Sequence, residues 1–310
     1  MTGEICYANI FWQALELGLI FGWLLFCPQL TLAFDTTQDN QMLLLVNSKH
    51  TLDASWQPND LLDIAKLAPS TKSQMQLRDA AANAYVRMYT AYKAENNLPL
   101  NTISGFRSFA VQKQLFYGKV AGRQRSGQSY TTAYNNTLRY TAFPGTSEHQ
   151  TGLAIDVSSN ASLLESFRNT KQGQWLLAHC WEHGFILRYD EDKTALTTIA
   201  FEPWHYRYVG LPHSLIMRDN DWVLEEYMEA LHALQPEEYL EYTDPTNVDM
   251  LYRIYYTTDT QREYEDIVSI SSDNCGGYII TCRSLKVEEL LTAWSEQARQ
   301  GLPLLRIAAS

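Results

Sequence analysis

The sequence predicts an α+β fold in which a small mixed or antiparallel sheet is flanked by helices, followed by a small C-terminal α+β appendage. Apolar residues recur at helical spacing from Leu77 to Tyr92. Short β-branched and aromatic runs, such as Trp204 to Val209, recur between turn residues. The 310 residues, with 45% hydrophobic and 19% charged side chains, suffice for one sizeable domain and an appendage.

Local signals predict the order of the elements. Ser73 and Gln76 form a capping box at the start of the first long helix, and Pro99 ends it. In chain order we expect a strand at 42–46, a helix from Ser73, a strand at 100–103, a helix at 111–120, a strand at 152–157, a helix at 174–183, strands at 185–189, 196–201 and 204–209, and a helix at 223–234. Segments 122–130 and 140–147 are expected to be irregular and to bracket a functional site.

An acidic, Pro-containing linker at 237–246 is expected to separate a domain at 42–236 from the appendage at 237–310. The appendage should contain strands at 251–257, 267–270 and 278–282 and a helix at 287–294. It has no catalytic constellation, which favours a packing or interaction role. Cys275 and Cys282 flank a short segment and could form a disulfide in an oxidising compartment.

The N-terminal residues 1–41 combine a hydrophobic segment with a polar linker. Their apolar run, 10–34, has the length of a signal-peptide core or of part of a membrane anchor, although Glu16 interrupts it and no Lys or Arg precedes it. A hydrophobic helix that packs on the domain is the alternative. We expect an exported protein, extracytoplasmic or anchored to the membrane through this segment.

The formal net charge of −11 argues against a nucleic-acid partner, because phosphate binding needs clustered Lys and Arg. It also gives no general attraction to anionic lipid surfaces or cell-wall polymers.

The run from Ser147 to Asp156, together with Glu202-Pro-Trp-His205, is the most informative part of the chain. It supplies two imidazoles, one carboxylate ligand and a second carboxylate, which is the inventory of a zinc hydrolase. Alternation along the predicted strand 152–157 directs Asp156 away from the apolar face. Glu202 and His205 are an odd number of residues apart, so we expect a bend at Pro203 to bring them to one side.

These motifs resemble the VanY-type D-alanyl-D-alanine carboxypeptidases and their LdcB-type relatives. The resemblance rests on S-x-H-x(6)-D, on E-x-W-H and on the upstream Ser104-Gly-Phe-Arg107-Ser108, and it extends from about Met42 to about Leu234. It implies a hedgehog/DD-peptidase-like fold and one Zn²⁺ ion bound by His149, Asp156 and His205. Phe106 stands where the family more often has Tyr.

The resemblance also implies roles for other residues. Glu202 is expected to be the general base, and Arg107 to neutralise a substrate carboxylate or the developing oxyanion. Gln112 and Ser147 match positions that hold the peptide in relatives. The implied partners are peptidoglycan stem peptides, and the implied reaction removes the C-terminal D-alanine from D-Ala-D-Ala termini.

Three alternatives remain open at this stage. Nothing in the metal motif specifies the stereochemistry of the residue before the cut, so an L,D-carboxypeptidase acting on tetrapeptide stems is the nearest rival. A D-Ala-D-Ala dipeptidase is another. A catalytically silent cell-wall-binding module would have lost a ligand or the base, whereas all four positions are intact here.

Overall fold

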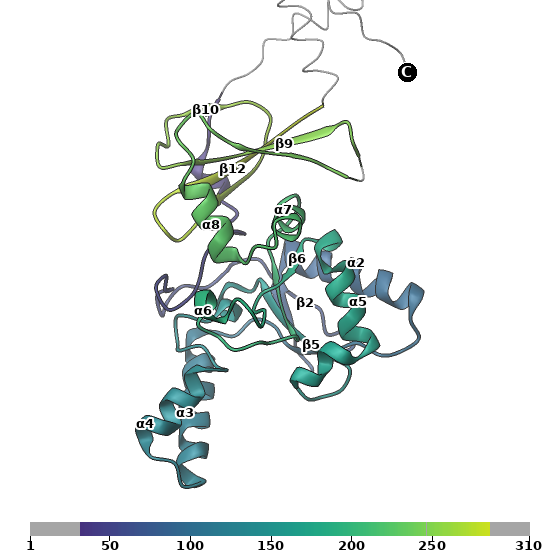
Figure 1. Ribbon diagram of the computed structural model, residues 1–310, viewed down its shortest axis with the longest axis vertical. Helices are drawn as coiled ribbons and strands as arrows, with labels where there is room; N and C mark the ends of the chain where they lie inside the picture. Colours follow the sequence, from purple (N-terminus) through teal and green to yellow (C-terminus); the bar gives the residue numbers. More distant parts are fainter. Residues whose placement is uncertain (1–31, 246, 286–310) are drawn as a thin grey trace, which may run out of the picture.

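The computed structural model describes residues 32–245 and 247–285 (Figure 1). The body of the molecule is built on a four-stranded antiparallel sheet with the order β4-β5-β7-β6. Its strands are β4 (Asn101–Ser104), β5 (Ala154–Ser158), β7 (His205–Tyr208) and β6 (Phe185–Leu187). A helical hairpin projects from one end of the body, and a second sheet lies at the other end (Figure 1).

One face of the central sheet packs against two helices, α2 (Asp79–Glu95) and α5 (Lys171–His179). Alternate residues of β5 and of the position before it, Leu153, Ile155 and Val157, enter this core and are fully buried. The predicted helical stripe supplies the opposing side chains, which include Tyr85 and Met88. Burial of this apolar surface is the main contribution to the stability of the body.

The opposite face of the same strands carries the polar residues of the motifs. Asp156 of β5 lies directly across from His205 of β7 in the antiparallel register, and also pairs with Ser104 of β4. Because successive side chains of a strand point to opposite faces, Ile155 and Tyr206 contact the core while Asp156 and His205 face away from it. The register therefore brings the two motifs together.

The helical hairpin consists of α3 (Phe109–Arg125) and α4 (Tyr130–Leu138). Ser108 and Ser129 cap the two helices, since each hydroxyl accepts a backbone N–H from the first turn. Segment 122–130, predicted to be irregular, is instead helical as far as Arg125.

A second antiparallel sheet follows, with the order β11-β12-β9-β8. Its strands are β8 (Leu240–Thr243), β9 (Met250–Thr257), β11 (Ile267–Ser272) and β12 (Tyr278–Leu285). It packs against α7 (His213–Asp219), α8 (Leu224–His232) and the segment 43–45 around one shared hydrophobic core. This C-terminal sheet is therefore joined to the body by apolar packing as well as by the chain.

Short elements complete the described chain. They are β1 (Leu32–Ala33), β2 (Leu61–Asp63), β3 (Gln76–Arg78), β10 (Glu263–Tyr264), α6 (Thr194–Thr197) and the 3-10 turns Thr36–Gln38, Glu148–Thr151, Glu165–Asn169 and Cys180–His183. β1 pairs with β10, and Phe34 packs on Tyr264 and Tyr278. Residues 32–40 therefore lie against the C-terminal sheet.

Two predicted elements are wrong because tertiary contacts override local pattern. The capping box at Ser73 does not start a helix: residues 76–78 form β3, which pairs with β2, and α2 begins at Asp79. Segment 42–46 begins in a turn and belongs to no sheet. Its backbone bonds instead to a loop and a side chain, with Leu45 N donating to Asp273 O at 2.9 Å and Arg207 donating to Leu44 O at 2.9 Å.

Two further elements differ in the second half of the chain. The strand predicted at 196–201 is replaced by α6 and by a turn in which Thr198 has a φ of 62°. The predicted linker 237–246 contains β8, which pairs with β9, so Leu240 and Tyr242 belong to a sheet.

The possible Cys275–Cys282 disulfide is not formed, and both thiols are free. Cys275 lies in the β11–β12 turn and packs against the core shared with the body, whereas Cys282 is buried in a separate cluster with Phe34 and Tyr264. The predicted helix 287–294 and most of the hydrophobic segment 10–34 lie outside the described residues. Within residues 32–245 and 247–285, no helix combines the length and apolar character needed to cross a membrane.

Candidate metal centre and substrate pocket

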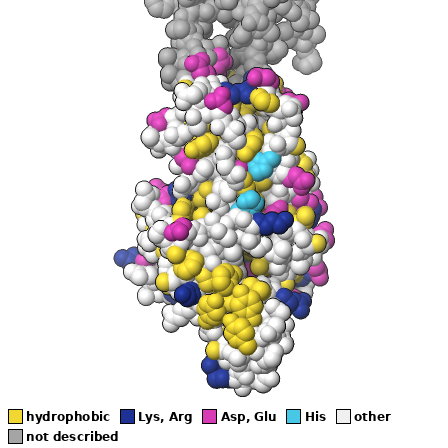
Figure 2. Space-filling model, turned by 90° about the vertical axis from the view of Figure 1, so that its left-hand side faces the viewer, with side chains coloured by type: hydrophobic (Ala, Val, Ile, Leu, Met, Phe, Trp, Pro, Cys, Tyr) yellow, Lys and Arg dark blue, Asp and Glu magenta, His cyan; other side chains and the backbone are white. Residues whose placement is uncertain are grey.

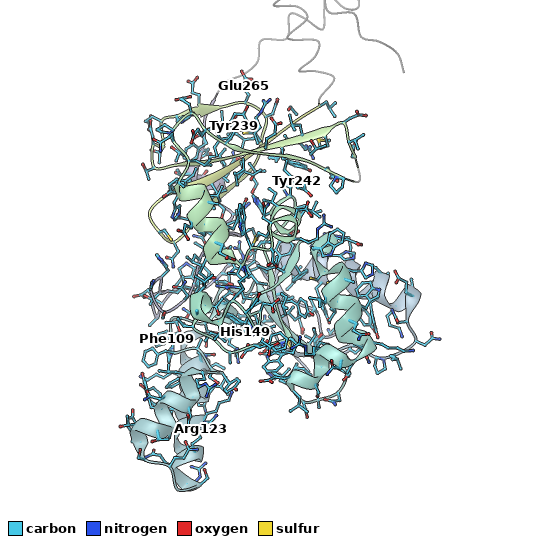
Figure 3. All side chains as sticks on the ribbon, in the orientation of Figure 1. Phe109, Arg123, His149, Tyr239, Tyr242 and Glu265 are labelled. Atoms are coloured by element: carbon cyan, nitrogen blue, oxygen red, sulfur yellow. The ribbon has the colours of Figure 1, made fainter. Side chains whose placement is uncertain are left out.

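A pocket of about 420 Å³ opens on the polar face of the central sheet, where the α3–α4 hairpin meets the body. Figure 3 shows His149 at this junction. All seven residues singled out from the sequence line the pocket: Arg107, Gln112, Ser147, His149, Asp156, Glu202 and His205. Asp156 lies in β5, His205 in β7 and Gln112 in α3, and the other four lie in the segments that connect the strands and helices.

The arginine motif and the histidine motif hold each other in place. His149 Nδ1 donates to Gly105 O at 2.7 Å, and Arg107 N donates back to His149 O at 3.0 Å. A side chain at Gly105 would clash with Gln76 O, which explains the glycine at this position. Because Nδ1 carries the proton, His149 Nε2 has its lone pair free to face Asp156.

Asp156 and His205 complete a compact group of donor atoms. Asp156 Oδ2 lies 3.2 Å from His149 Nε2, and Asp156 Oδ1 lies 3.1 Å from His205 Nδ1. Burial and the nearby Arg107 lower the pKa of His149 to about 4, so its imidazole is neutral. Burial opposes the charge of Asp156, but its contacts with His149 and His205 hold its pKa well below the ordinary value. A neutral imidazole and an ionised carboxylate are the forms that bind a metal.

The three side chains fit one metal ion. Their candidate ligand atoms all lie within 4.8 Å of one another, and all three residues are buried. His149 Nε2 is buried and finds no hydrogen-bond partner among the residues that the structure describes. Two imidazoles and one carboxylate suit zinc and similar transition metals, and three protein ligands leave a fourth position for water.

Behind His205 lies a buried group of charges that the sequence motifs did not indicate as part of the site. His205 Nε2 donates to Glu148 Oε2 at 3.3 Å, which leaves Nδ1 for the metal. Glu148 Oε1 in turn accepts from Arg188 Nε and from an Arg207 amino group, both at 2.7 Å, and Arg188 also pairs with Glu225. Burial opposes the charge of His205, but without a metal ion the hydrogen bonds to Asp156 and Glu148 raise its pKa to about 9, so an ion that binds Nδ1 must displace the proton from this atom.

Glu202 lies beside the ligands without belonging to the group. A turn in which His205 N donates to Glu202 O at 3.1 Å begins β7, so the expected bend at Pro203 is present. Glu202 Oε2 lies 3.8 Å from His205 Nδ1. Burial, reinforced by Asp156, raises the pKa of Glu202 to about 7, although His205, Arg107 and Lys119 oppose the shift. Such a carboxylate can accept a proton near neutral pH and release it again.

Two cations lie in the same pocket. Burial lowers the pKa of Arg107, and its Nε has no hydrogen-bond partner within the described part of the chain. Lys119 of α3 donates to Thr141 Oγ1 at 2.8 Å, and both burial and the neighbouring Arg107 lower its pKa. Lys119 could not be identified from the sequence, because only the path of α3 places it over the pocket.

Gln112 and Ser147 are the weaker substrate-binding predictions. Gln112 Nε2 donates to Ala142 O at 2.6 Å, whereas its buried Oε1 has no partner in the described residues and is free to accept an N–H group. Ser147 is 3% exposed and reaches the pocket wall just before His149. Tyr189 and Trp204, for which a wall or core role was left open, also line the pocket.

The outer surface of the α3–α4 hairpin is rich in hydrophobic side chains (Figure 2). Its exposed large residues are Val111, Tyr117 and Tyr130. Beneath them Phe116 forms a small core with Val120 and Ala133, which stabilises the hairpin that carries Gln112 and Lys119.

The comparisons agree with this geometry. Residues 74–211 match the family model VanY, D-alanyl-D-alanine carboxypeptidase. A D-alanyl-D-alanine carboxypeptidase of Enterococcus faecium is 32% identical over 253 residues, which cover 77% of this chain and 74% of that protein.

Two solved structures resemble the body of the molecule. The LD-carboxypeptidase LdcB is 36% identical, covers 61% of this chain and 86% of its own, and has a TM-score of 0.54. A vancomycin-resistance D,D-pentapeptidase VanY was solved as a point mutant in complex with Zn(II). It is 29% identical, covers 61% of this chain and 99% of its own, and has a TM-score of 0.53. With its buried His-Asp-His group and these relatives, the chain belongs to the VanY D-alanyl-D-alanine carboxypeptidase family.

Proposed function

We propose that the protein is a zinc carboxypeptidase that removes the C-terminal D-alanine from peptidoglycan stem peptides ending in D-Ala-D-Ala. The observation that carries this proposal is the pairing of two features in one pocket: the metal-binding group with Glu202 beside it, and the cations Arg107 and Lys119. A terminal carboxylate needs such cations, whereas the middle of a peptide chain does not.

Each pocket residue then has a role that its contacts support. His149, Asp156 and His205 would hold the ion, which when bound supplies Lewis acidity for the attacking water and the scissile carbonyl. Glu202 takes the proton from the attacking water and passes it to the leaving amine. Arg107 binds the terminal carboxylate or the oxyanion, and Lys119 adds positive charge to the same side. The unpaired Gln112 Oε1 accepts a substrate N–H, and Ser147 contacts the peptide.

A second candidate is an L,D-carboxypeptidase acting on tetrapeptide stems. The 36% identity to LdcB, whose structure bears the name LD-carboxypeptidase, favours it. Both candidates use the same metal group and base, and they differ in the configuration of the residue before the scissile bond. A dipeptidase acting on free D-Ala-D-Ala would use the same chemistry on a shorter substrate.

A substrate panel distinguishes these functions. The zinc-loaded full chain is incubated with a pentapeptide stem, a tetrapeptide stem and the D-Ala-D-Ala dipeptide, and the products are weighed by mass spectrometry. Loss of one alanine from the pentapeptide alone supports the proposal, and cleavage confined to the tetrapeptide supports the L,D alternative. A chelator should abolish the activity and added zinc restore it. Activity unaffected by complete metal removal would contradict the zinc mechanism.

We further propose that the enzyme works outside the cytoplasmic membrane, exported or anchored through segment 10–34. The apolar run in the sequence and the cell-wall substrate support this location. Fractionation of cells that carry the full chain, compared with a variant that lacks residues 1–31, tests it. Both forms found in the cytoplasm would contradict it.

A further inference from the structure

A second group of metal-ligand side chains lies where the C-terminal sheet meets the body. His232 at the end of α8 and Asp273 and Cys275 of the β11–β12 turn have donor atoms that all lie within 4.8 Å of one another. His50 of the body lies next to this group, with its Nδ1 at 3.3 Å from Cys275 Sγ.

Asp273 is held so that one carboxylate oxygen faces this group. Its Oδ1 accepts the backbone N–H groups of Cys275, Gly276 and Gly277 at 2.7, 3.0 and 3.1 Å. Its Oδ2 contacts His232 Nε2 at 2.8 Å. The residue is fully buried, so the orientation of its carboxylate is determined by the turn.

The backbone around the group is also held firmly across the junction. Leu45 N donates to Asp273 O at 2.9 Å, and Asn274 Nδ2 donates to Leu45 O at 3.0 Å. On the body side, Asn47 N donates to His50 O, and His50 N donates to Asn47 Oδ1, each at 3.0 Å. These bonds hold His232, Asp273 and Cys275 together and keep His50 in contact with Cys275 before any ion binds, which lowers the entropic cost of forming a site.

We propose that His232, Asp273 and Cys275 bind a second metal ion of the zinc class, that His50 turns from its contact with Cys275 to become the fourth ligand, and that the ion joins the C-terminal sheet to the body. Two imidazoles, one thiolate and one carboxylate are a donor set for zinc, whereas calcium and magnesium prefer oxygen alone. Zinc bonds of about 2.0–2.3 Å place tetrahedral ligand atoms roughly 3.3–3.8 Å apart. The 3.3 Å between Cys275 and His50 matches this spacing, and the 2.8 Å between His232 and Asp273 requires a small outward shift.

The four protein ligands would close the coordination sphere, so the ion has no open position for substrate. Its role is structural. It links a loop after segment 43–46, the last turn of α8 and the β11–β12 turn, three parts of the chain that are distant in sequence. The metal-binding group of His149, Asp156 and His205 contains no sulfur ligand. An experiment that detects a metal–thiolate bond can therefore distinguish the two sites.

Cobalt substitution of the full chain tests the proposal directly. Because Cys6 and Cys27 lie outside the described residues, both are first replaced by serine. Cobalt bound at the second site should give a thiolate-to-cobalt charge-transfer absorption in the near ultraviolet, which the catalytic group cannot produce. Cys275→Ser should abolish this absorption, and the matched control Cys282→Ser should retain it. Absence of the band from the parent, or its persistence in Cys275→Ser, would overturn the proposal.

Zinc content provides a second measurement that does not depend on activity. After zinc loading and desalting, the parent should retain about two ions per chain, and His149→Ala and His232→Ala should each retain about one. In the His149→Ala background, added zinc should raise the melting temperature, and the further change Cys275→Ser should remove that rise. A parent that retains only one ion, with no zinc-dependent rise in the His149→Ala background, would show that Asp273 merely caps the turn and hydrogen-bonds His232.

Discussion

Glu202 combines burial with access to the reaction centre. It lies in the pocket wall at 7% exposure, next to His205 but outside the metal-binding group. Burial and Asp156 raise the pKa of this carboxyl, whereas a bound cation would lower it, and both effects bear on the proposed role of Glu202 as the general base.

Glu202→Gln should therefore lower kcat by about 10²–10⁴-fold and leave zinc bound, because the amide retains the shape but cannot accept a proton. Turnover of the stem peptide and zinc content, measured on the same preparation, check this. Near-normal kcat in a zinc-loaded variant would show that Glu202 only orients His205.

Glu148 is the residue at which the metal group meets the buried ion pairs. It is 1% exposed and is the shared partner of Arg188, Arg207 and His205. Removing its charge leaves two buried arginines without this partner. The stability lost in this way is larger than the net stabilisation that the intact network provides.

Glu148→Gln should lower the free energy of unfolding by about 3–5 kcal/mol, and weaken zinc binding by about 10–100-fold through loss of the support of His205. Chemical denaturation and competition with a chelator measure the two effects. Glu225→Gln is the matched control, since Glu225 pairs with Arg188 but does not touch His205. It should lose stability and keep its zinc affinity. Equal zinc affinity in the two variants would contradict the role of Glu148.

At the scale of elements, the sequence predicted the parts in which local pattern and tertiary structure agree. The alternation around Asp156 and the helical stripe from Ala81 to Tyr92 identify β5 and α2, because in both the periodic apolar face is the one that is buried. The candidate ligands His149, Asp156 and His205 were identified in a different way, because they stand in ordered motifs that resemble those of the VanY family.

Contacts between distant segments account for the rest. Residues 76–78 pair with 61–63, segment 42–46 bonds to Arg207 and to the β11–β12 turn, and β8 is ordered by β9. None of these partners has a local signature. Lys119 and Glu148 were likewise missed because their roles depend on which helix or strand lies opposite.

His213 connects three elements through a neutral imidazole. Its Nδ1 lies 2.8 Å from Tyr227 OH of α8, and its Nε2 lies 3.2 Å from Thr281 Oγ1 of β12. Burial lowers its pKa to about 3. Below the ordinary histidine pKa of about 6.5, the unfolded chain binds a proton that the folded chain does not, so stability falls as the pH decreases from about 6.5 to about 3.

His213→Gln should remove this dependence. The stability difference between the parent and the variant should shrink by up to about 1.4 kcal/mol for each pH unit below 6.5. Urea denaturation of both proteins at a series of pH values measures this difference, in which the titration of all other groups cancels. A constant difference across that range would show that His213 is already protonated in the folded protein.

At the scale of the whole molecule, the C-terminal sheet and the body share one hydrophobic core. Ile254 and Ile279 of the sheet are fully buried in the same cluster as Tyr227 and Leu231 of α8. The sequence divides the chain at residues 236–237, but this packing crosses the division, and the hydrogen bonds between Leu45 and the β11–β12 turn reinforce it. The two parts should therefore unfold together.

Ile279→Ala tests this coupling. Removing the side chain should cost about 2–5 kcal/mol through lost burial and the cavity that remains, and should lower the melting temperature of the body in the same transition. Scanning calorimetry, with loss of stem-peptide cleavage followed over the same temperatures, measures both. Val268→Ala is the control, because Val268 of β11 is 46% exposed and its replacement should leave the melting temperature nearly unchanged. Two separate transitions, with cleavage lost only in the unshifted one, would show that the body is stable on its own. A single shifted transition would mean that the sheet contributes to the stability of the active site from the far side of the molecule.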